Sequence, residues 1–171
     1  MLMPTRRRTV APRGKTPVLP AWDRRDRISV ISAVTVSPRR KKRNLYFHLL
    51  ADNRNICAPD VVDFLRHLLR HIRRPITIVW DRSNTHDRSK AVWEWLAKQT
   101  KMRTERFPGY APELNPDEQV WSNLKYARLS NYAPNNTRQL RRRLVRELQH
   151  LRRRPDLLAS FIRHAQIHLR L

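Results

Sequence analysis

Apolar residues along the chain fall into patterns that predict both strands and helices. β-Branched residues run almost without interruption over residues 28–36, and a second apolar stretch covers 45–50 after a basic turn, which indicates a hairpin. Two short strands are predicted at 76–80, directly after Pro75, and at 102–107. Strands that alternate with helices are typical of an α/β fold.

Helical spacing of apolar residues predicts the remaining elements. Pro59 opens a first helix, in which apolar residues recur every three or four positions up to Ile72. Further amphipathic helices are expected at 87–100, 137–151 and 155–169. The last two carry many arginines on their polar faces.

A turn-rich segment followed by another helix occupies residues 107–125. Breakers forbid regular structure at its start, at Pro108, Gly109 and Pro112. Asn115 then has the character of a helix N-cap and Pro116 that of a first helical position, so Asp117 and Glu118 lie in the first turn, where the helix dipole favours negative charge. Glu118 is thus held on a rigid element. The alternative is that both acids are ordinary first-turn residues.

A second candidate carboxylate, Asp81, stands at the carboxyl end of the predicted strand 76–80. Ligands of α/β proteins collect at this end of the sheet, because the loops there open a crevice and the strand holds the side chain still. The alternative is an Asp that begins a turn before Ser83 and Asn84.

The charge of the chain gives the strongest indication of its partner. The chain has 171 residues, with 37 Lys and Arg against 14 Asp and Glu, a formal net charge of +23. Such an excess favours a polyanionic partner, and nucleic acid is the default one; a membrane surface is a weaker candidate because the basic residues are spread along the whole chain. Two basic clusters are candidate phosphate contacts, the alternative being solvated surface: Arg39, Arg40, Lys41, Lys42 and Arg43 in the hairpin turn, and Arg141, Arg142, Arg152 and Arg153 in the C-terminal helices.

Cysteine content and hydropathy narrow the class of protein. The single cysteine, Cys57, excludes an internal disulfide and fits a reducing cytoplasm. The longest mainly apolar stretch without a charge has nine residues, far short of the roughly twenty that a membrane-spanning helix needs. The N-terminus lacks the apolar core of a signal peptide, so we expect a cytoplasmic protein without a membrane partner.

The strand that ends in Asp81 and the run Tyr-Ala-Pro-Glu-Leu-Asn-Pro-Asp-Glu at 110–118, leading to Trp121 and Leu124-Lys125, together resemble the catalytic core of mariner-type DDE transposases, particularly those of bacterial insertion sequences. The resemblance implies a catalytic core at 28–128, preceded by a basic extended arm at 1–27 and followed by a basic helical extension of the same domain at 129–171. It also implies a ribonuclease H-like mixed sheet flanked by helices.

The same resemblance implies the chemistry. Asp81 and Glu118 match the family's second and third catalytic carboxylates, which hold Mg²⁺ or Mn²⁺. His86 matches a residue that contacts DNA phosphate or orients a water, although a loop histidine is also often merely solvated, and Lys125 would contact DNA. The partner is double-stranded DNA, as element ends and as target, with a possible homodimer in the full-length family and a nucleoid-associated location in a bacterium.

One expected part is missing from the pattern. Family members carry the first catalytic Asp on an opening strand at the centre of the sheet, just before the segment that matches residues 2–8. Asp23 and Asp26 lie in the arginine-rich arm and in no recognisable strand, so neither replaces it. We therefore expect an N-terminally truncated transposase that lacks its first strand and whose activity is lost or impaired.

Two other functions remain open at this point. A non-enzymatic basic nucleic-acid-binding protein would explain the charge, but it would need neither an apolar strand that ends in Asp81 nor the Leu-Asn-Pro-Asp-Glu run. A hydrolytic nuclease of the same fold, which cuts DNA without joining strands, is the third interpretation.

Overall fold

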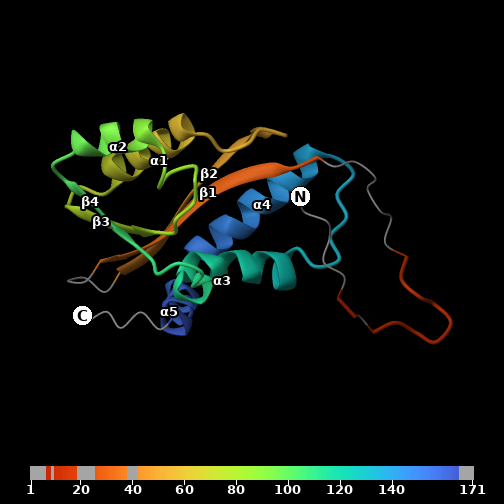
Figure 1. The fold of residues 1–171 in the computed structure, drawn as a ribbon. Coiled ribbons are helices and arrows are strands. Elements are labelled where there is room, and N and C mark those ends of the chain that lie inside the picture. Colours follow the sequence, from red (N-terminus) through yellow and green to blue (C-terminus); the bar gives the residue numbers. More distant parts are fainter. Residues whose placement is uncertain (1–6, 9, 19–25, 38–41, 166–171) are drawn as a thin grey trace.

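The computed structural model describes residues 7–8, 10–18, 26–37 and 42–165 (Figure 1). The elements follow the expected order. Strands and helices occur as β1 Ile28–Ser37, β2 Lys42–Asp52, α1 Ala58–His71, β3 Ile76–Trp80, α2 Lys90–Ala97, β4 Met102–Arg106, α3 Pro116–Asn123, α4 Thr137–Arg152 and α5 Pro155–His164, with a 3-10 turn η1 at Pro112–Leu114 and a π-helical turn η2 at Leu124–Arg128.

The strands form two separate two-stranded sheets. β1 and β2 pair antiparallel, with Ser32 opposite Phe47 and Val34 opposite Leu45. β3 and β4 pair parallel through a crossover that contains α2, as parallel neighbours require. The mixed sheet expected from the sequence, without its first strand, is in two parts, and within the described residues β1 and β3 each have one edge without a strand partner.

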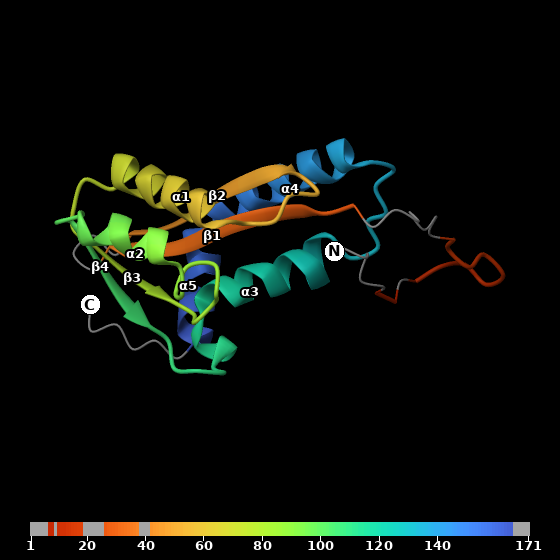
Figure 2. The same ribbon diagram turned by 45° about the horizontal axis from the view of Figure 1, so that its top comes forward.

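Helices cover both faces of the β1–β2 hairpin (Figures 1 and 2). Because side chains alternate along a strand, Val30 and Val34 of β1 face one core, and Ile31 and Ala33 face the other. The first core contains α3, α4 and α5, where leucines such as Leu148 are fully buried. The second contains α1, α2, β3 and β4, so the two sheets share a core of side chains rather than a backbone ladder.

Local signals explain where the helices begin. The Asn115 side chain accepts a hydrogen bond from the Asp117 backbone N–H over 3.0 Å, which confirms the expected cap of α3. α2 is shorter than the predicted range 87–100, because its cap is Ser89 and Asp87 remains in the preceding turn. The last part of the predicted range 155–169, from residue 166 on, lies outside the described residues. In the part of the chain that the structure describes, no helix is long and apolar enough to cross a membrane.

Candidate active site

Asp81 follows β3 directly, and its carboxylate is fixed from one side. Its Oδ1 accepts a hydrogen bond from the Ser83 backbone N–H over 3.0 Å, and His86 Nε2 lies 2.9 Å both from Oδ1 and from the Asp81 carbonyl oxygen. The His86 ring lies against Trp80, with ring centroids 4.7 Å apart. The side chain of Asp81 nevertheless remains 58% exposed. The His86 side chain therefore contacts Asp81, and its Nε2 orients the Asp81 carboxylate.

The loops after β3 and before α3 run next to each other. The Phe107 backbone N–H donates to the Trp80 carbonyl over 2.9 Å, so the two strands end side by side. Beyond them, a Cβ added at Gly109 would lie 3.8 Å from Arg82 Nη1, ordinary van der Waals contact. Both ribbon views show the loop after β3 passing beside the start of α3 (Figures 1 and 2). The two candidate carboxylates thus belong to neighbouring segments.

The first turn of α3 sends its two acidic side chains in different directions. Glu118 is exposed, and its carboxylate makes no hydrogen bond or ion pair within the described residues. Asp117 turns inward: its Oδ2 accepts hydrogen bonds from Ser32 Oγ over 2.7 Å and from Trp121 Nε1 over 3.0 Å. The helix start is therefore tied to β1 by Asp117, while Glu118 is left open to solvent.

Asp117 is an unusual carboxyl group. Its Oδ1 is buried and has no hydrogen-bond partner among the described residues. Burial raises the pKa of Asp117 to about 6, the bonds from Ser32 and Trp121 oppose this shift, and the neighbouring charge of Glu118 adds to it. Burial of Asp117 was not predicted from the sequence, which singled out only Glu118 of these two acids as a site residue. A signal was present, since Asp117 precedes the apolar residues Val120, Trp121 and Leu124 at helical spacing.

The donor chemistry of the site fits a hard divalent cation in part. Several carboxylates of this basic chain pair with arginine, as Asp60 does with Arg54 and Asp87 with Arg106, whereas Asp81 and Glu118 have no lysine or arginine partner in the described ranges. Exposed carboxylates are the ligands that Mg²⁺ and Mn²⁺ prefer. Within those ranges, however, no cluster of three or more His, Cys, Asp or Glu is arranged to hold a metal ion.

The basic residues expected to bind DNA differ in their surroundings. Arg141 donates to the Leu50 carbonyl and pairs with Asp52 at 2.8 Å, and Arg152 donates to Asn44 over 3.1 Å. Arg142 and Arg153 are exposed without a partner among the described residues, and Lys42 and Lys125 are also exposed. Arg39, Arg40 and Lys41 lie outside the described residues, as does Asp23.

Comparison with solved structures shows similarity to the Mos1 mariner transposase. A Mos1 paired-end complex with Mn matches with a TM-score of 0.57 at 15% identity, over 98% of this chain and 53% of the Mos1 chain. The Mos1 strand transfer complex gives a TM-score of 0.53 at 15% identity, over 98% and 52%, and the Mos1 catalytic domain gives 0.50 at 14%, over 83% of both chains. At these identities the likeness shows the fold, and the chain spans about half of the Mos1 chain in the two complexes.

Sequence comparison is informative at the level of the family. No curated protein matches the chain. The family model described as DDE superfamily endonuclease matches residues 2–141, which include both Asp81 and Glu118. The match covers most of the chain, and the fold agrees with it. The chain belongs to the DDE superfamily endonuclease family.

Proposed function

We propose that this chain is the catalytic domain of a DDE transposase in which Asp81 and Glu118 hold a divalent metal ion at a DNA phosphodiester. The observation that carries the proposal is a pair of exposed carboxylates without a lysine or arginine partner among the described residues, Asp81 after β3 and Glu118 in the first turn of α3. The loop that leads into α3 passes the loop after β3 where Arg82 approaches Gly109. A divalent cation would neutralise these two carboxylates where no arginine does.

Each residue of the site has a distinct task in this proposal. Asp81 and Glu118 supply hard oxygen ligands, and His86 holds the Asp81 carboxylate through its Nε2. Asp117 anchors the first turn of α3 on Ser32, which keeps Glu118 at a fixed position. Bound Mg²⁺ or Mn²⁺ would neutralise charge at the scissile phosphate and lower the pKa of a water.

A third carboxylate would come from a strand outside the described segments. β1 and β3 each offer an unpaired edge, and a strand antiparallel to β1 and parallel to β3 would join the two sheets into the one mixed sheet of a ribonuclease H-like fold. We propose that this strand carries the first catalytic Asp. Without such a strand, Asp81 and Glu118 would be two of three ligands and catalysis would be impaired, because two-metal chemistry needs a carboxylate shared by both ions.

The proposed substrate is double-stranded DNA, at the ends of an insertion sequence and at its target. In such a reaction the strand is cut at the element end and the freed 3′ end is joined to target DNA. Asp81 and Glu118 would hold the metal ion in both steps, since cutting and joining are displacements at phosphorus that differ only in the attacking oxygen.

Calorimetric titration with Mn²⁺ tests the site. The variants Asp81→Asn and Glu118→Gln should each weaken Mn²⁺ binding at least tenfold, because each removes one of two charged ligands. The matched control is Glu113→Gln, which removes an exposed carboxylate only five positions before Glu118, and it should leave the affinity unchanged. Equal weakening by all three variants, or none by the first two, would overturn the assignment.

A further inference from the structure

The helix α4 separates its charges into two groups. At 100° per residue, Arg138, Arg142, Arg146 and the C-cap residue Arg153, directly after α4, fall within about 80° of the helix circumference, and these four residues form the outer stripe. Leu140, Leu144, Leu148 and Leu151 lie on the opposite side and are buried against the hairpin and α5. The outer stripe therefore points away from the core along the whole length of the helix.

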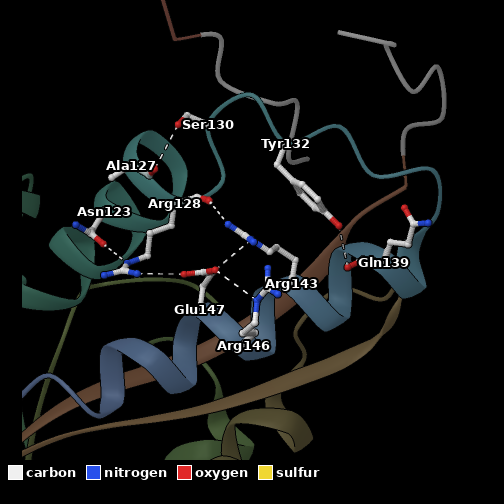
Figure 3. A network of polar contacts seen from close by, with 9 residues as sticks. All are labelled: Asn123, Ala127, Arg128, Ser130, Tyr132, Gln139, Arg143, Arg146 and Glu147. Carbon is white, nitrogen blue, oxygen red and sulfur yellow. Dashed lines mark hydrogen bonds and ion pairs between the residues drawn. The ribbon is translucent and has the colours of Figure 1, made fainter. Parts of the chain in front are cut away.

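Two arginines on the inner side of this region, Arg128 and Arg143, contact other side chains of the protein. Glu147 is the one acidic residue of α4, and it turns toward the end of η2, where its Oε2 lies 3.1 Å from Arg128 Nη1 and its Oε1 lies 3.1 Å from Arg143 Nε (Figure 3). Arg143 also lies over the ring of Tyr132, 5.6 Å from its centroid. Glu147 thus balances part of the inward charge.

The outer stripe has no such balance. Arg138, Arg142 and Arg153 are exposed and form no ion pair within the described residues, and Arg146 reaches Glu147 only at 3.7 Å. The neighbouring acids are committed elsewhere, Asp52 to Arg141 and Asp156 to Arg154. Four like charges in one line repel each other, and a partner with regularly spaced negative charge would relieve that repulsion.

The surroundings of the stripe indicate which polyanion fits. Gln139, Gln149 and His150 are exposed beside it. Apart from the His150 ring they offer no aromatic surface on which single-stranded bases stack, and none has an apolar side chain of the kind that enters a membrane interface. The stripe runs for about 22 Å, which spans about six base pairs of a duplex at about 3.4 Å each. Arginine donors with a single small ring beside them suit a phosphate backbone better than a row of stacked bases.

We propose that the outer stripe of α4 binds the phosphate backbone of duplex DNA, as a second contact surface separate from the Asp81 and Glu118 site. The identity of the polyanion as DNA rests on the proposed function, whereas the location of the surface rests on α4 alone. The stripe reads no sequence, because guanidinium contacts to phosphate are the same for every base pair. It would hold the DNA that flanks the segment in the active site.

The test is the salt dependence of duplex binding by a triple variant, Arg138→Gln with Arg142→Gln and Arg153→Gln. The matched control is Arg70→Gln with Arg73→Gln and Arg74→Gln, which removes the same charge from exposed positions at the end of α1. Binding to a labelled duplex is measured by fluorescence anisotropy between about 50 and 200 mM salt, the range over which phosphate contacts change affinity strongly. Thermal melts establish that both variants fold.

The stripe variant should weaken binding on the order of 100-fold and reduce the slope of log affinity against log salt by about 2 to 3, since each phosphate contact contributes about 0.9. The control should change the slope by less than one such contact. Equal changes in both variants would mean diffuse charge attraction and would overturn the proposal, as would tighter binding of single-stranded nucleic acid or anionic vesicles than of the duplex. Calorimetric titration of the stripe variant with Mn²⁺, done in parallel, should give the parent affinity, so failure of the metal site and failure of the stripe are told apart.

Discussion

Ser32 and Asp117, which are 85 positions apart in the sequence, are joined by a hydrogen bond in which Ser32 Oγ donates to Asp117 Oδ2 over 2.7 Å. This contact attaches the first turn of α3 to the middle of β1. The next residue, Glu118, is consequently held at the surface on a turn whose position this hydrogen bond fixes. A buried carboxyl group at this place has an energetic cost that depends on pH.

Replacing Asp117 by Asn should reveal that cost. Because the pKa of Asp117 is raised from 3.8 to about 6 in the folded chain, the folded state holds the proton more tightly, and its contribution to stability is complete below about pH 4 and lost as pH rises through 6. The difference corresponds to about 3 kcal/mol. Asparagine can still accept both hydrogen bonds without carrying a charge. The stability of the parent relative to Asp117→Asn should therefore fall by up to about 3 kcal/mol between pH 4 and 7.

Urea unfolding at a series of pH values measures this difference. Asp63→Asn is the control, because it removes an exposed carboxylate from the surface of α1. Its offset from the parent should change little over the same range. Parallel curves for the parent and Asp117→Asn would show that the Asp117 carboxyl is solvated and not buried.

Glu147 should be the most costly acid to lose from the C-terminal helices. Glu147→Gln leaves Arg128, Arg143 and Arg146 around a neutral group, and breaking a largely buried ion pair on one side costs about 3 kcal/mol. Glu94→Gln makes the same change in the exposed pair with Lys90 at 3.7 Å, and should cost less than about 0.5 kcal/mol. Denaturant midpoints of the two variants give the comparison, and similar midpoints would mean that the Glu147 network is not buried in solution.

The chain by itself should not nick DNA. Supercoiled plasmid incubated with the chain and Mg²⁺ or Mn²⁺ should show no more relaxation than with Asp81→Asn, because two carboxylates leave the shared metal position without its ligand. Agarose gels measure the relaxed fraction. Robust cleavage would mean that an acid within the chain completes the site. Asp26 and Asp52 would then be the first to test, although in this structure they bind Asn53 and Arg141.

Much of the fold follows from local sequence signals. β3 matches its predicted range, because Pro75 and Asp81 bound a run of β-branched residues, and α3 begins where Asn115 and Pro116 indicate. α2 was predicted too long, since helical spacing extends back to Asp87 although that side chain pairs with Arg106 of β4. Such a contact is tertiary and leaves no periodic signal.

The candidate site was predictable in part for the same reason. A strand end and a helix start identify Asp81 and Glu118 by their local geometry. The roles of Ser32 and of His86 depend on which distant or neighbouring atoms their side chains reach, 2.7 Å from Asp117 in one case and 2.9 Å from Asp81 in the other. The pairing of the strands, β1 with β2 and β3 with β4, depends on contacts between elements, and the pattern within a single segment does not specify it.

The location of bound Mn²⁺ is the most direct test of the paired carboxylates. Substoichiometric Mn²⁺ is added to the nitrogen-15-labelled chain, and the loss of amide signals around the paramagnetic ion is followed by NMR. The signals of Ser83 and Glu118 should weaken first, and Asp81→Asn should abolish that loss. Broadening that centres on another exposed acid such as Asp63, or that spreads evenly over all of them, would contradict a metal site formed by Asp81 and Glu118.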